Sequence, residues 1–426
     1  MERYNEYKDS GVQWLGEIPS HWAIMPLKYS GRFCKGKLPS ETNENCLGKP
    51  IIGASEMNGN MPSVYSEDNS VPQCTKNDIL FLWDGANAGL VSFFHEGIVA
   101  STVTKFTCDN SNIVSTYLYY LEKNYQRYYK ERVGGTTIPH MNSQYIASCP
   151  LLIPSTQEQK AIADYLNTTT AKIDEAIAQQ QKMIDLLNER KQIIINNAVT
   201  KGLNPDAPMK DSGVEWIGEI PEHWEIKKLK HVCQAFGRIG FRGYSTTDLV
   251  DEGEGCITLS PSNMRDGKMQ YGRCTYLSWE KYEESPEIKV FNGDILFVKT
   301  GSTYGKSSIV EDLPLEATIN PQLLVFKNFT CNNMFLANVL QSTAIKTQVE
   351  ISVIGGTIPT ISQQKILNYV FPFPTEDEQY AIVEYVESKS APINAAIKAA
   401  EKQISLLQER KQIIINDVVT GKVKVS

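Results

Sequence analysis

The sequence predicts an α+β protein in which two domains of mixed α/β structure are joined by two long antiparallel coiled-coil helices, as a pseudo-two-fold internal repeat. Three observations predict this fold. The chain of 426 residues carries the same motifs twice, in the same order. Each copy contains short apolar segments bounded by glycine and aspartate, which are typical of strands. Each copy ends in a heptad pattern of apolar residues.

The internal repeat is clearest at the two ends of each half. Residues 8–28 and 210–230 are identical at 15 of 21 positions. Three further motifs recur: Asn77–Phe81 as Gly293–Phe297, Gly135–Pro139 as Gly355–Pro359, and Glu189–Asn196 unchanged as Glu409–Asn416. The offset grows from 202 to 220, so the second half carries extra residues in its middle. Because the ends of the two halves match and their middles diverge, we infer one structural framework, present twice, whose two copies carry out different versions of one function.

The motifs divide the chain into four segments. We expect a mixed domain over residues 1–154, a helical spacer over 155–202, a second mixed domain over 203–373 and a second spacer over 374–426. Each domain opens with a repeated pair of tryptophans, which we interpret mainly as core anchors: Trp14 and Trp22, then Trp216 and Trp224. The apolar runs Ile79–Trp83 and Ile295–Val298 are predicted strands.

Each spacer begins with a helix start signal. Ser155–Glu158 and Thr375–Glu378 both fit the S/T-x-x-E capping box, and each follows a proline. We expect a break near residues 168–170 and 388–390, after which Pro392 suits the first turn of a second, longer helix. Gly202 and Gly421 fall where these helices should end.

The longer helices carry an apolar seam at heptad spacing, with Lys191 and Lys411 as matching polar members. The seam residues are Ile173, Ile177, Ile184, Leu187 and Ile194 in the first spacer, and Ile393, Ile397, Ile404, Leu407 and Ile414 in the second. Two such seams in one chain most simply bury each other, in an antiparallel pair. The alternative is that each helix packs separately on its own domain.

The predicted helix length gives a spacing. A helix of about 28 residues is about 42 Å long, which corresponds to about 12 base pairs of DNA at about 3.4 Å per base pair. Two domains held about one helical turn apart could address the same face of a duplex.

Composition restricts the class of protein. The chain contains no run of 18 apolar residues, and its polar N-terminal residues lack an apolar signal core, so we expect it in the cytoplasm. Nine cysteines without a C-x-x-C pair fit free thiols in a reducing compartment, and no metal site is expected. The net charge of −7 counts against a generally basic nucleic-acid binder but allows a local basic strip.

The repeated motifs resemble one known family over essentially the whole chain. They are W-[LI]-G-E-I-P-x-H-W (Trp14–Trp22, Trp216–Trp224), [NG]-D-I-L-F, G-x-T-I-P and the helices that end in ERKQIIIN. In this order they resemble the specificity subunit of Type I restriction-modification systems. The resemblance implies two target-recognition domains, each of which reads one half of a split DNA site, and two helical regions that bind the partner subunits.

The resemblance also implies the partners and cofactors. Two methyltransferase subunits would use S-adenosylmethionine to methylate adenine in double-stranded DNA, and two restriction subunits, with ATP and Mg, would translocate and cut it. The chain itself would have no catalytic residues, metal or cofactor. Consistent with this, Gly301–Ser307 is one residue short of a phosphate-binding loop.

We expect DNA contacts from two loops in each half. The first loop follows the [NG]-D-I-L-F strand, where hydroxyls, amides and charged groups can reach base edges or phosphates; its candidates are Lys299, Thr300, Ser302, Thr303, Tyr304 and Lys306, with Trp83, Asp84 and Asn87 in the first half. The second loop contributes Thr136, Thr137, His140 and Asn142, and Thr357, Thr360, Ser362 and Gln363. This second loop could equally be a framework turn.

Basic residues near the start of each domain are further candidates, since arginine commonly reads guanine. They are Arg238 and Arg242 in the second half, and Arg32, Lys35 and Lys37 in the first. Other functions stay open: a specificity subunit of a Type II-like fused restriction-methylation enzyme, a nuclease acting alone, or a coiled-coil adaptor without DNA affinity.

Overall fold

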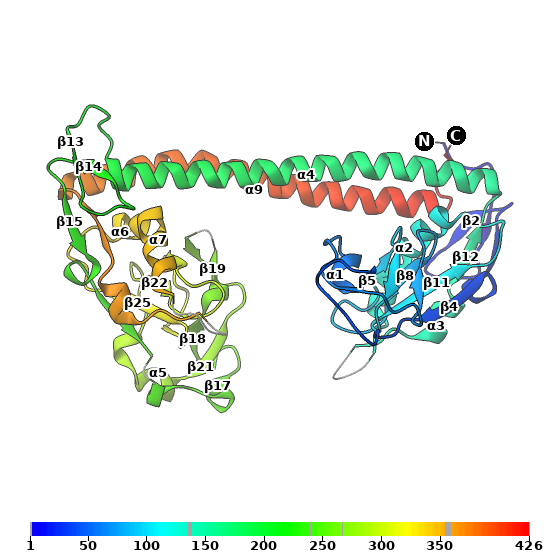
Figure 1. The fold of residues 1–426 in the computed structure, drawn as a ribbon, viewed down its shortest axis with the longest axis horizontal. Coiled ribbons are helices and arrows are strands. Elements are labelled where there is room, and N and C mark those ends of the chain that lie inside the picture. Colours follow the sequence, from blue (N-terminus) through cyan, green and yellow to red (C-terminus); the bar gives the residue numbers. More distant parts are fainter. Residues whose placement is uncertain (1, 135–138, 239, 266, 354–358, 426) are drawn as a thin grey trace. The chain divides into compact units, whose positions relative to one another are not determined.

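The computed structural model describes residues 2–134, 139–238, 240–265, 267–353 and 359–425. The chain forms two compact units, Met1–Gln181 with Glu401–Ser426 and Lys182–Ala400. Unit 1 contains the mixed domain that precedes the first long helix, here called domain 1. Unit 2 contains the mixed domain between the two long helices, here called domain 2 (Figure 1). Each unit also holds part of both long helices, so its boundaries cross the predicted spacers.

Both domains open with the same antiparallel elements. In domain 1, β1 (Tyr7–Asp9) pairs with β2 (Glu17–Pro19), and β3 (Ala23–Pro26) pairs with β12 (Pro150–Ile153). In domain 2, β13 (Met209–Asp211) pairs with β14 (Glu219–Pro221), and β15 (Glu225–Lys228) pairs with β26 (Val370–Phe373). The repeated opening therefore joins the start of each domain to its end.

Domain 1 contains two four-stranded sheets. The first has the order β4 (Gly31–Lys35), β11 (Val103–Cys108), β8 (Ile79–Leu82), β9 (Val91–Ser92). The second has the order β6 (Tyr65–Ser66), β5 (Lys49–Ile52), β10 (Gly97–Val99), β7 (Gln73–Cys74). The helices are α1 (Ala54–Met57), α2 (Ser115–Glu131) and α3 (Ser143–Ser148), with a 3-10 turn η1 (Leu27–Tyr29).

Domain 2 enlarges this plan. Its first sheet has six strands in the order β16 (Gln234–Gly237), β25 (Leu323–Lys327), β22 (Ile295–Val298), β23 (Ser307–Ile309), β20 (Lys268–Met269), β19 (Met264–Arg265). Its second sheet has the order β17 (Leu249–Val250), β21 (Thr275–Ser278), β18 (Gly255–Leu259), β24 (Ala317–Ile319). The helices are α5 (Trp279–Glu283), α6 (Asn333–Gln341), α7 (Thr343–Ser352) and α8 (Gln363–Leu367), with 3-10 turns at Leu229–His231, Gly240–Arg242, Thr246–Asp248, Pro261–Asn263 and Pro286–Ile288.

The predicted strands Ile79–Phe81 and Ile295–Val298 are the central strands of the first sheets. Alternate side chains of a strand point to opposite faces. Ile79 and Phe81 join the core beneath α2, whereas Leu80 and Leu82 join a second core toward the other sheet (Figure 1). Domain 2 divides Ile295, Phe297, Leu296 and Val298 between two cores in the same way. Because both faces are covered, these strands are apolar throughout instead of alternating.

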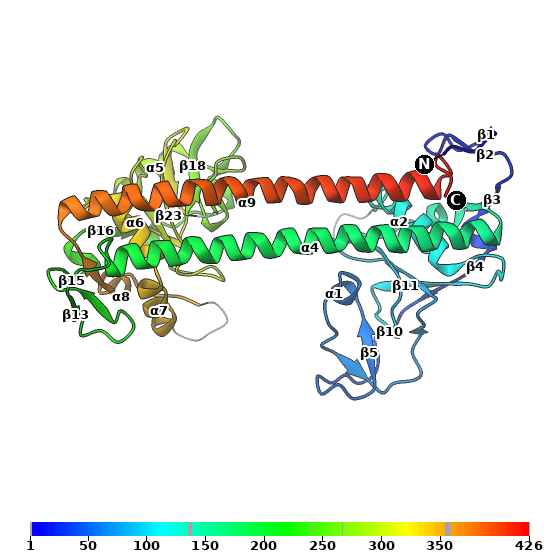
Figure 2. The ribbon, with the colours of Figure 1, turned by 90° about the horizontal axis from the view of Figure 1, so that it is seen from above.

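The two long helices are α4 (Thr156–Lys201) and α9 (Glu376–Val419), of 46 and 44 residues. In unit 1, Lys411 Nζ on α9 lies 2.7 Å from Asp174 Oδ2 on α4. In unit 2, Lys191 Nζ on α4 donates to Asn394 Oδ1 on α9 at 3.0 Å. Both units therefore place the late part of one helix beside the early part of the other, which is an antiparallel arrangement (Figure 2).

The predicted break near residues 168–170 and 388–390 was wrong, because each long helix is continuous. Pro392 lies inside α9 instead of starting a second helix. The hydroxyl of Thr168 donates to the Asp164 carbonyl at 2.9 Å, so this residue bonds within the helix instead of interrupting it. Packing also overrides the weak local propensity, since Thr170 and Ser390 are buried. The predicted spacing of about 12 base pairs rests on a helix of about 28 residues. Both long helices exceed that length, at 46 and 44 residues.

Each domain packs on both long helices of its unit. The core of domain 1 includes Ile162 and Leu166 from the start of α4 and Val418 from the end of α9. The core of domain 2 includes Val199 from the end of α4 and Ile382 from the start of α9. The alternative in which each helix packs only on its own domain was wrong for these helix ends. All ten seam residues are at least partly buried, and Ile173, Ile184 and Ile393 are the most buried of them.

The repeated opening motif fixes the start of each long helix. Both predicted capping boxes are present, as Glu158 Oε2 accepts from the Ser155 backbone at 3.1 Å and Glu378 Oε2 accepts from the Thr375 backbone at 3.1 Å. The histidine of the opening motif contacts the same glutamate: His21 Nε2 lies 2.9 Å from Glu158 Oε1, and His223 Nε2 lies 2.9 Å from Glu378 Oε1. We call each of these arrangements a histidine clamp.

The tryptophans of the openings do not all have one role. Trp22 and Trp224 are fully buried, as expected of core anchors. Trp14 is partly buried, with its ring centroid 4.3 Å from that of Tyr128. Trp216 is 41% exposed, so its interpretation as a core anchor was wrong.

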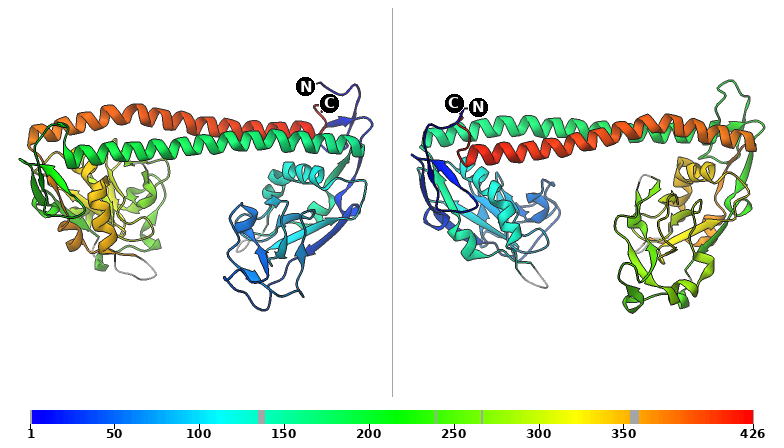
Figure 3. Two further views of the ribbon diagram at one scale, coloured as in Figure 1. Left: turned by 45° about the horizontal axis from the view of Figure 1, so that its top comes forward. Right: turned by 180° about the vertical axis from the view of Figure 1, so that it is seen from behind.

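Both chain ends lie in unit 1. Glu2 forms an antiparallel bridge with Lys424, and Tyr7 Oη donates to the Gly421 carbonyl at 3.2 Å (Figure 3). The C-terminal residues thus pack against the domain 1 opening.

Among the described residues, no helix combines the length and the hydropathy needed to span a membrane.

Candidate nucleic-acid interface

The two predicted loops of domain 1 meet in space. The first loop (83–89) follows β8, and the described part of the second loop (139–144) leads into α3. Asp84 and His140 form an antiparallel bridge. The Gly85 N–H donates to the Pro139 carbonyl at 3.0 Å, and the Met141 N–H donates to the Trp83 carbonyl at 3.0 Å. Segments more than 50 residues apart are therefore held together by backbone bonds that do not depend on their side chains.

Charged side chains gather at this bridge. Asp84 Oδ1 lies 2.6 Å from His140 Nδ1, and Asp84 Oδ2 lies 2.8 Å from Lys35 Nζ. The His140 and Lys35 side chains are about half exposed, whereas that of Asp84 is 14% exposed. Burial raises the pKa of Asp84, but hydrogen bonds from Lys35 and His140 outweigh it and hold the pKa below its ordinary value. The carboxylate is therefore ionised at neutral pH.

Domain 2 forms the same bridge with different side chains. Thr300 and Thr360 are the bridge pair. The Gly301 N–H donates to the Pro359 carbonyl at 3.0 Å, and the Ile361 N–H donates to the Lys299 carbonyl at 2.9 Å. The backbone bonds match those of domain 1 one for one, although the charged pair of domain 1 is replaced by two hydroxyls.

Each domain has a lysine near its bridge, at a different place in the sequence. Lys35 is the last residue of β4, and the last residue of the equivalent strand β16 is Gly237. In domain 2 the lysine is Lys299, which follows β22 directly. Its Nζ lies 3.3 Å from the position that a Cβ on Gly237 would occupy. Burial lowers the pKa of Lys299, which is partly withdrawn into the domain.

Several predicted residues surround each bridge. Asn87, Ser302 and Thr303 are exposed at the tips of the first loops. Asn142 and Ser362 are exposed and cap short helices, since Asn142 Oδ1 accepts from the Tyr145 N–H at 3.0 Å and Ser362 Oγ accepts from the Lys365 N–H at 3.3 Å. Both proposed roles of the second loop, framework turn and exposed polar surface, are thus compatible with its structure.

Other predicted residues have framework contacts. Trp83 packs against the domain 1 core and Tyr304 against the domain 2 core. Gln363 Nε2 donates to the Ala235 carbonyl at 2.7 Å, and Lys306 Nζ donates to the Met264 carbonyl. These bonds fix the two side chains to the domain, so their place in the structure is more framework than surface.

The predicted basic residues mostly lie in ion pairs or inside the domains. Arg238 is buried and donates to the Ile319 carbonyl at 3.1 Å and to Thr318 Oγ1 at 3.0 Å, so its expected position on a reading surface was wrong. Arg242 pairs with Glu287 at 3.3 Å.

In domain 1 the basic candidates differ in position. Arg32 pairs with Asp109 at 2.8 Å, near the opposite end of β4 from Lys35. Lys37 is exposed. The predicted candidates Thr136, Thr137 and Thr357 lie outside the described residues.

Sequence reasoning missed the pairing of the two loops and the contact of Asp84 with both Lys35 and His140. A signal existed, because Asp84 and Thr300 are aligned by an offset of 216, and His140 and Thr360 by an offset of 220. Two aligned positions that differ within matching frameworks are candidates for variable function. Nothing in the linear pattern showed that they face each other.

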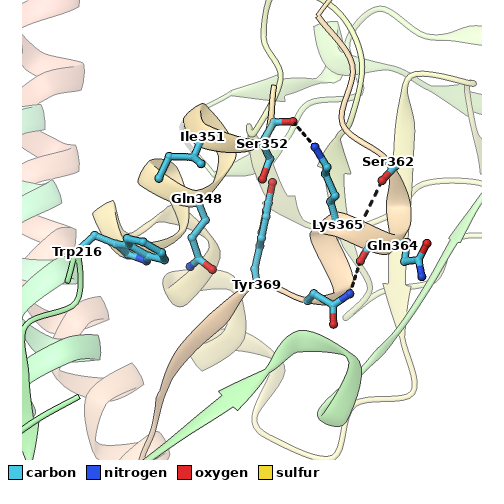
Figure 4. A pocket seen from close by; sticks show the side chains of 9 residues that line it. Trp216, Gln348, Ile351, Ser352, Ser362, Gln364, Lys365 and Tyr369 are labelled. Atoms are coloured by element: carbon cyan, nitrogen blue, oxygen red, sulfur yellow. Dashed lines mark hydrogen bonds between the residues drawn. The ribbon is translucent and has the colours of Figure 1, made fainter. Parts of the chain in front are cut away.

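Domain 2 also has a cavity that the sequence did not predict. Its volume is about 590 Å³, and its lining comes from the opening motif, α7, α8 and the segment before β26. Figure 4 shows Trp216 at one side and Lys365, whose Nζ donates to the Ser352 carbonyl at 3.4 Å, at the other. In domain 1 the aligned tryptophan, Trp14, packs against Tyr125 and Tyr128. The cavity therefore marks a difference in packing between the domains.

The comparisons with known proteins agree with this architecture. Residues 19–184 and 221–406 each match the family described as the Type I restriction modification DNA specificity domain. The chain therefore belongs to this family and carries two copies of its domain.

Two relatives match over most of their length. The MjaVIII specificity subunit of Methanocaldococcus jannaschii, a type I restriction enzyme, is 28% identical over 100% of this chain and 98% of the relative. The EcoBI specificity subunit of Escherichia coli is 22% identical over 90% of this chain and 81% of the relative.

One solved structure shares the fold. It comes from work on complex assembly and conformational transition of the type I R-M system. Its TM-score is 0.63 at 15% identity, and the match covers 95% of this chain and 99% of that chain.

Proposed function

We propose that this chain reads a bipartite DNA site as the specificity subunit of a Type I restriction-modification complex, with one domain for each half-site. The observation that carries the proposal is the pair of bridges: one backbone arrangement, built twice, presents Asp84 and His140 in domain 1 and Thr300 and Thr360 in domain 2. Sequence is read by side chains at base edges, and a fixed backbone with exchanged side chains suits two readers of different sequences.

In this proposal α4 and α9 form an antiparallel coiled coil that spaces the two readers. The buried seam residues and the similar register of the Lys411–Asp174 and Lys191–Asn394 contacts support it. An adaptor without DNA affinity would have no need for different bridge residues within a framework that is repeated in both domains.

Exposed apolar residues on the two long helices are evidence for the binding of two copies of one partner subunit. Met183, Leu186 and Ile193 on α4 in unit 2 are each 52% exposed. Their repeat equivalents on α9 in unit 1 include Leu406 and Ile413, with similar exposure. Repeated exposed apolar residues are a feature of protein-binding surfaces. We assign the exposed apolar residues of each unit to the binding of one methyltransferase subunit. Two restriction subunits would then bind the assembled complex.

The chemistry would belong to those partners. The methyltransferase subunits would bind S-adenosylmethionine and flip the target adenines out of the duplex, and the restriction subunits would use ATP and Mg. In this scheme the chain is non-catalytic, acts in the cytoplasm and determines where the complex binds.

The test is to co-express the chain with a methyltransferase subunit in a host without adenine methylation and to map N6-methyladenine by long-read sequencing. We expect a split motif with two short defined halves and a fixed gap. Native mass spectrometry of the same complex should count two methyltransferase copies. A soluble complex that leaves the genome unmodified would contradict the proposal and favour the adaptor alternative.

A further inference from the structure

We propose that the two facing side chains of each bridge are the specificity-determining pair of their domain: Asp84 with His140 in domain 1 and Thr300 with Thr360 in domain 2. The proposal rests on the proposed function and names the residues that carry it out. We call a bridge pair together with the lysine near it a reading platform.

The geometry of domain 1 defines what His140 presents. The ionised carboxylate of Asp84 can only accept hydrogen bonds, so the His140 Nδ1 atom at 2.6 Å is the donor. In the neutral ring, Nε2 is then an acceptor whose orientation is fixed by Asp84. The side chain is 56% exposed, so this acceptor is accessible. In the major groove, the matching donors are the amino groups of adenine and cytosine. In its neutral form His140 therefore suits an amino-bearing base.

Asp84 is a positioning residue in this scheme. Its side chain is only 14% exposed, and both of its oxygens are occupied, one by His140 and one by Lys35. A carboxylate held in this way orients the imidazole and fixes its tautomer, as partners of metal-ligating histidines do. Each oxygen could still accept a second bond, but the Asp84 side chain is far less exposed than that of His140, so His140 is better placed to meet a base edge.

Domain 2 presents different chemistry from the same backbone. Thr360 is exposed and Thr300 half-buried. Each threonine offers a methyl group and a hydroxyl, which suit the thymine methyl and a polar base edge. The two platforms should therefore prefer different bases at equivalent positions of their half-sites.

The lysine near the bridge is the common part of the two platforms. Lys35 Nζ lies beside Asp84, and Lys299 Nζ lies beside Gly237, the residue at the position of Lys35 in the equivalent strand. Both domains thus have an ammonium group near the bridge although the bridge pairs differ, which suits a sequence-independent contact, and a backbone phosphate is the matching anion. The lysine should therefore contribute affinity and the bridge pair should contribute sequence preference.

The first experiment exchanges the bridge pairs within the complex of chain and methyltransferase. D84T/H140T should alter or relax one base position in one half of the methylated motif and leave the other half unchanged. T300D/T360H should act only on the other half. If the wild-type complex methylates no split motif, the proposed function is wrong. If the wild-type complex methylates a split motif and both variants methylate the same motif, the assignment of the bridge pairs is wrong and the proposed function stands.

The second experiment tests His140 directly, because an exchange could act by local misfolding. At the base position that D84T/H140T alters, the adenine or cytosine is replaced by an analogue without the amino group. We expect the wild-type complex to lose about ten-fold in affinity, and H140A to show no further loss with the analogue. An equal loss in wild type and H140A would overturn the assignment of His140.

The third experiment separates the lysine from the bridge pair. K35A should weaken binding to all sequences and reduce the slope of log affinity against log salt by about one, without a change in motif. K76A is the matched control, since Lys76 is an exposed lysine of domain 1 that is also in an ion pair, with Glu96 at 3.9 Å. Equal effects of K35A and K76A would contradict the phosphate contact.

Discussion

Domain 1 covers its central sheet with the single helix α2, whereas domain 2 divides the aligned segment into α6 and α7 at Ser342. The residue of α2 aligned with Ser342 is Glu122, which is fully buried and accepts a hydrogen bond from Tyr129. In domain 1 Trp14 packs on Tyr125 and Tyr128, and in domain 2 the aligned Trp216 lines a cavity of about 590 Å³.

Other features are the same in both domains. The four-residue central strand, the bridge between the two loops and the histidine clamp all recur with nearly equal distances. The shared features hold the reading loops and the long helices, and the differing features lie in the covering layer. Each domain therefore has its own packing in the helical layer that covers the sheet, whereas the parts that position the loops and the long helices are the same in both domains.

The largest expected difference between the domains is a pH dependence that Glu122 gives to domain 1. Burial raises the pKa of Glu122 from 4.5 to about 8. Between these values Glu122 is ionised in the unfolded chain and protonated in the folded domain, so its contribution to the free energy of unfolding is greatest below pH 4.5 and falls as pH rises toward 8. The slope should be on the order of 1 kcal/mol per pH unit.

Hydrogen exchange measured by mass spectrometry can follow each domain separately. Amides of α2 should lose protection as pH rises from about 5 to 8 after correction for intrinsic exchange, and those of α6 should not. E122Q stays neutral at every pH and should remove the slope. A slope that persists in E122Q, or appears equally in α6, would contradict this account of the covering layer.

The next effect compares the aligned tryptophans. W14A removes a ring that packs on Tyr125 and Tyr128 and should reduce the free energy of unfolding of unit 1 by about 2 kcal/mol. W216A removes a ring that lines a cavity and is 41% exposed, so its cost in unit 2 should be below about 1 kcal/mol. Denaturant unfolding of each variant measures both values. Equal costs would show that Trp216 is an anchor after all.

The sequence predicted the parts of the fold that are encoded locally. Capping boxes at Ser155 and Thr375, the central strands and the helix seam are local patterns, and the structure contains all of them. The predicted helix break failed because a local signal was overridden by packing: Thr170 is buried and lies 3.1 Å from the Tyr120 hydroxyl of α2.

The candidate interface was predictable only in part for the same reason. Asp84 and His140 were each identified, but their contact depends on how two distant loops fold. Arg238 looked like a surface arginine beside glycines, and only the three-dimensional structure places Thr318 and Ile319 around it. Nor did the sequence show that each domain has a lysine near its bridge, at a different place in the repeat.

The smallest expected effect tests a feature that the two units share, the histidine clamp. Burial raises the pKa of Glu158 and Glu378, but hydrogen bonds from the clamp histidine and the capping residue, and at Glu378 also from Trp224, outweigh it, so both pKa values lie below their ordinary value. A lowered folded pKa contributes stability above the unfolded value near 4.5, and this stability is lost as pH falls through the folded value. Both glutamates are partly exposed, so each contribution should be below about 1 kcal/mol.

H21A and H223A should therefore reduce the protection of the first turns of α4 and α9 by similar, small amounts at pH 7. E158Q and E378Q should in addition remove the loss of protection between about pH 5 and 3. Hydrogen exchange of peptides that start at Thr156 and Glu376 measures both effects. If one clamp proved several-fold stronger than the other, the two openings would not be equivalent. The histidine clamp would then belong with the features that differ between the domains.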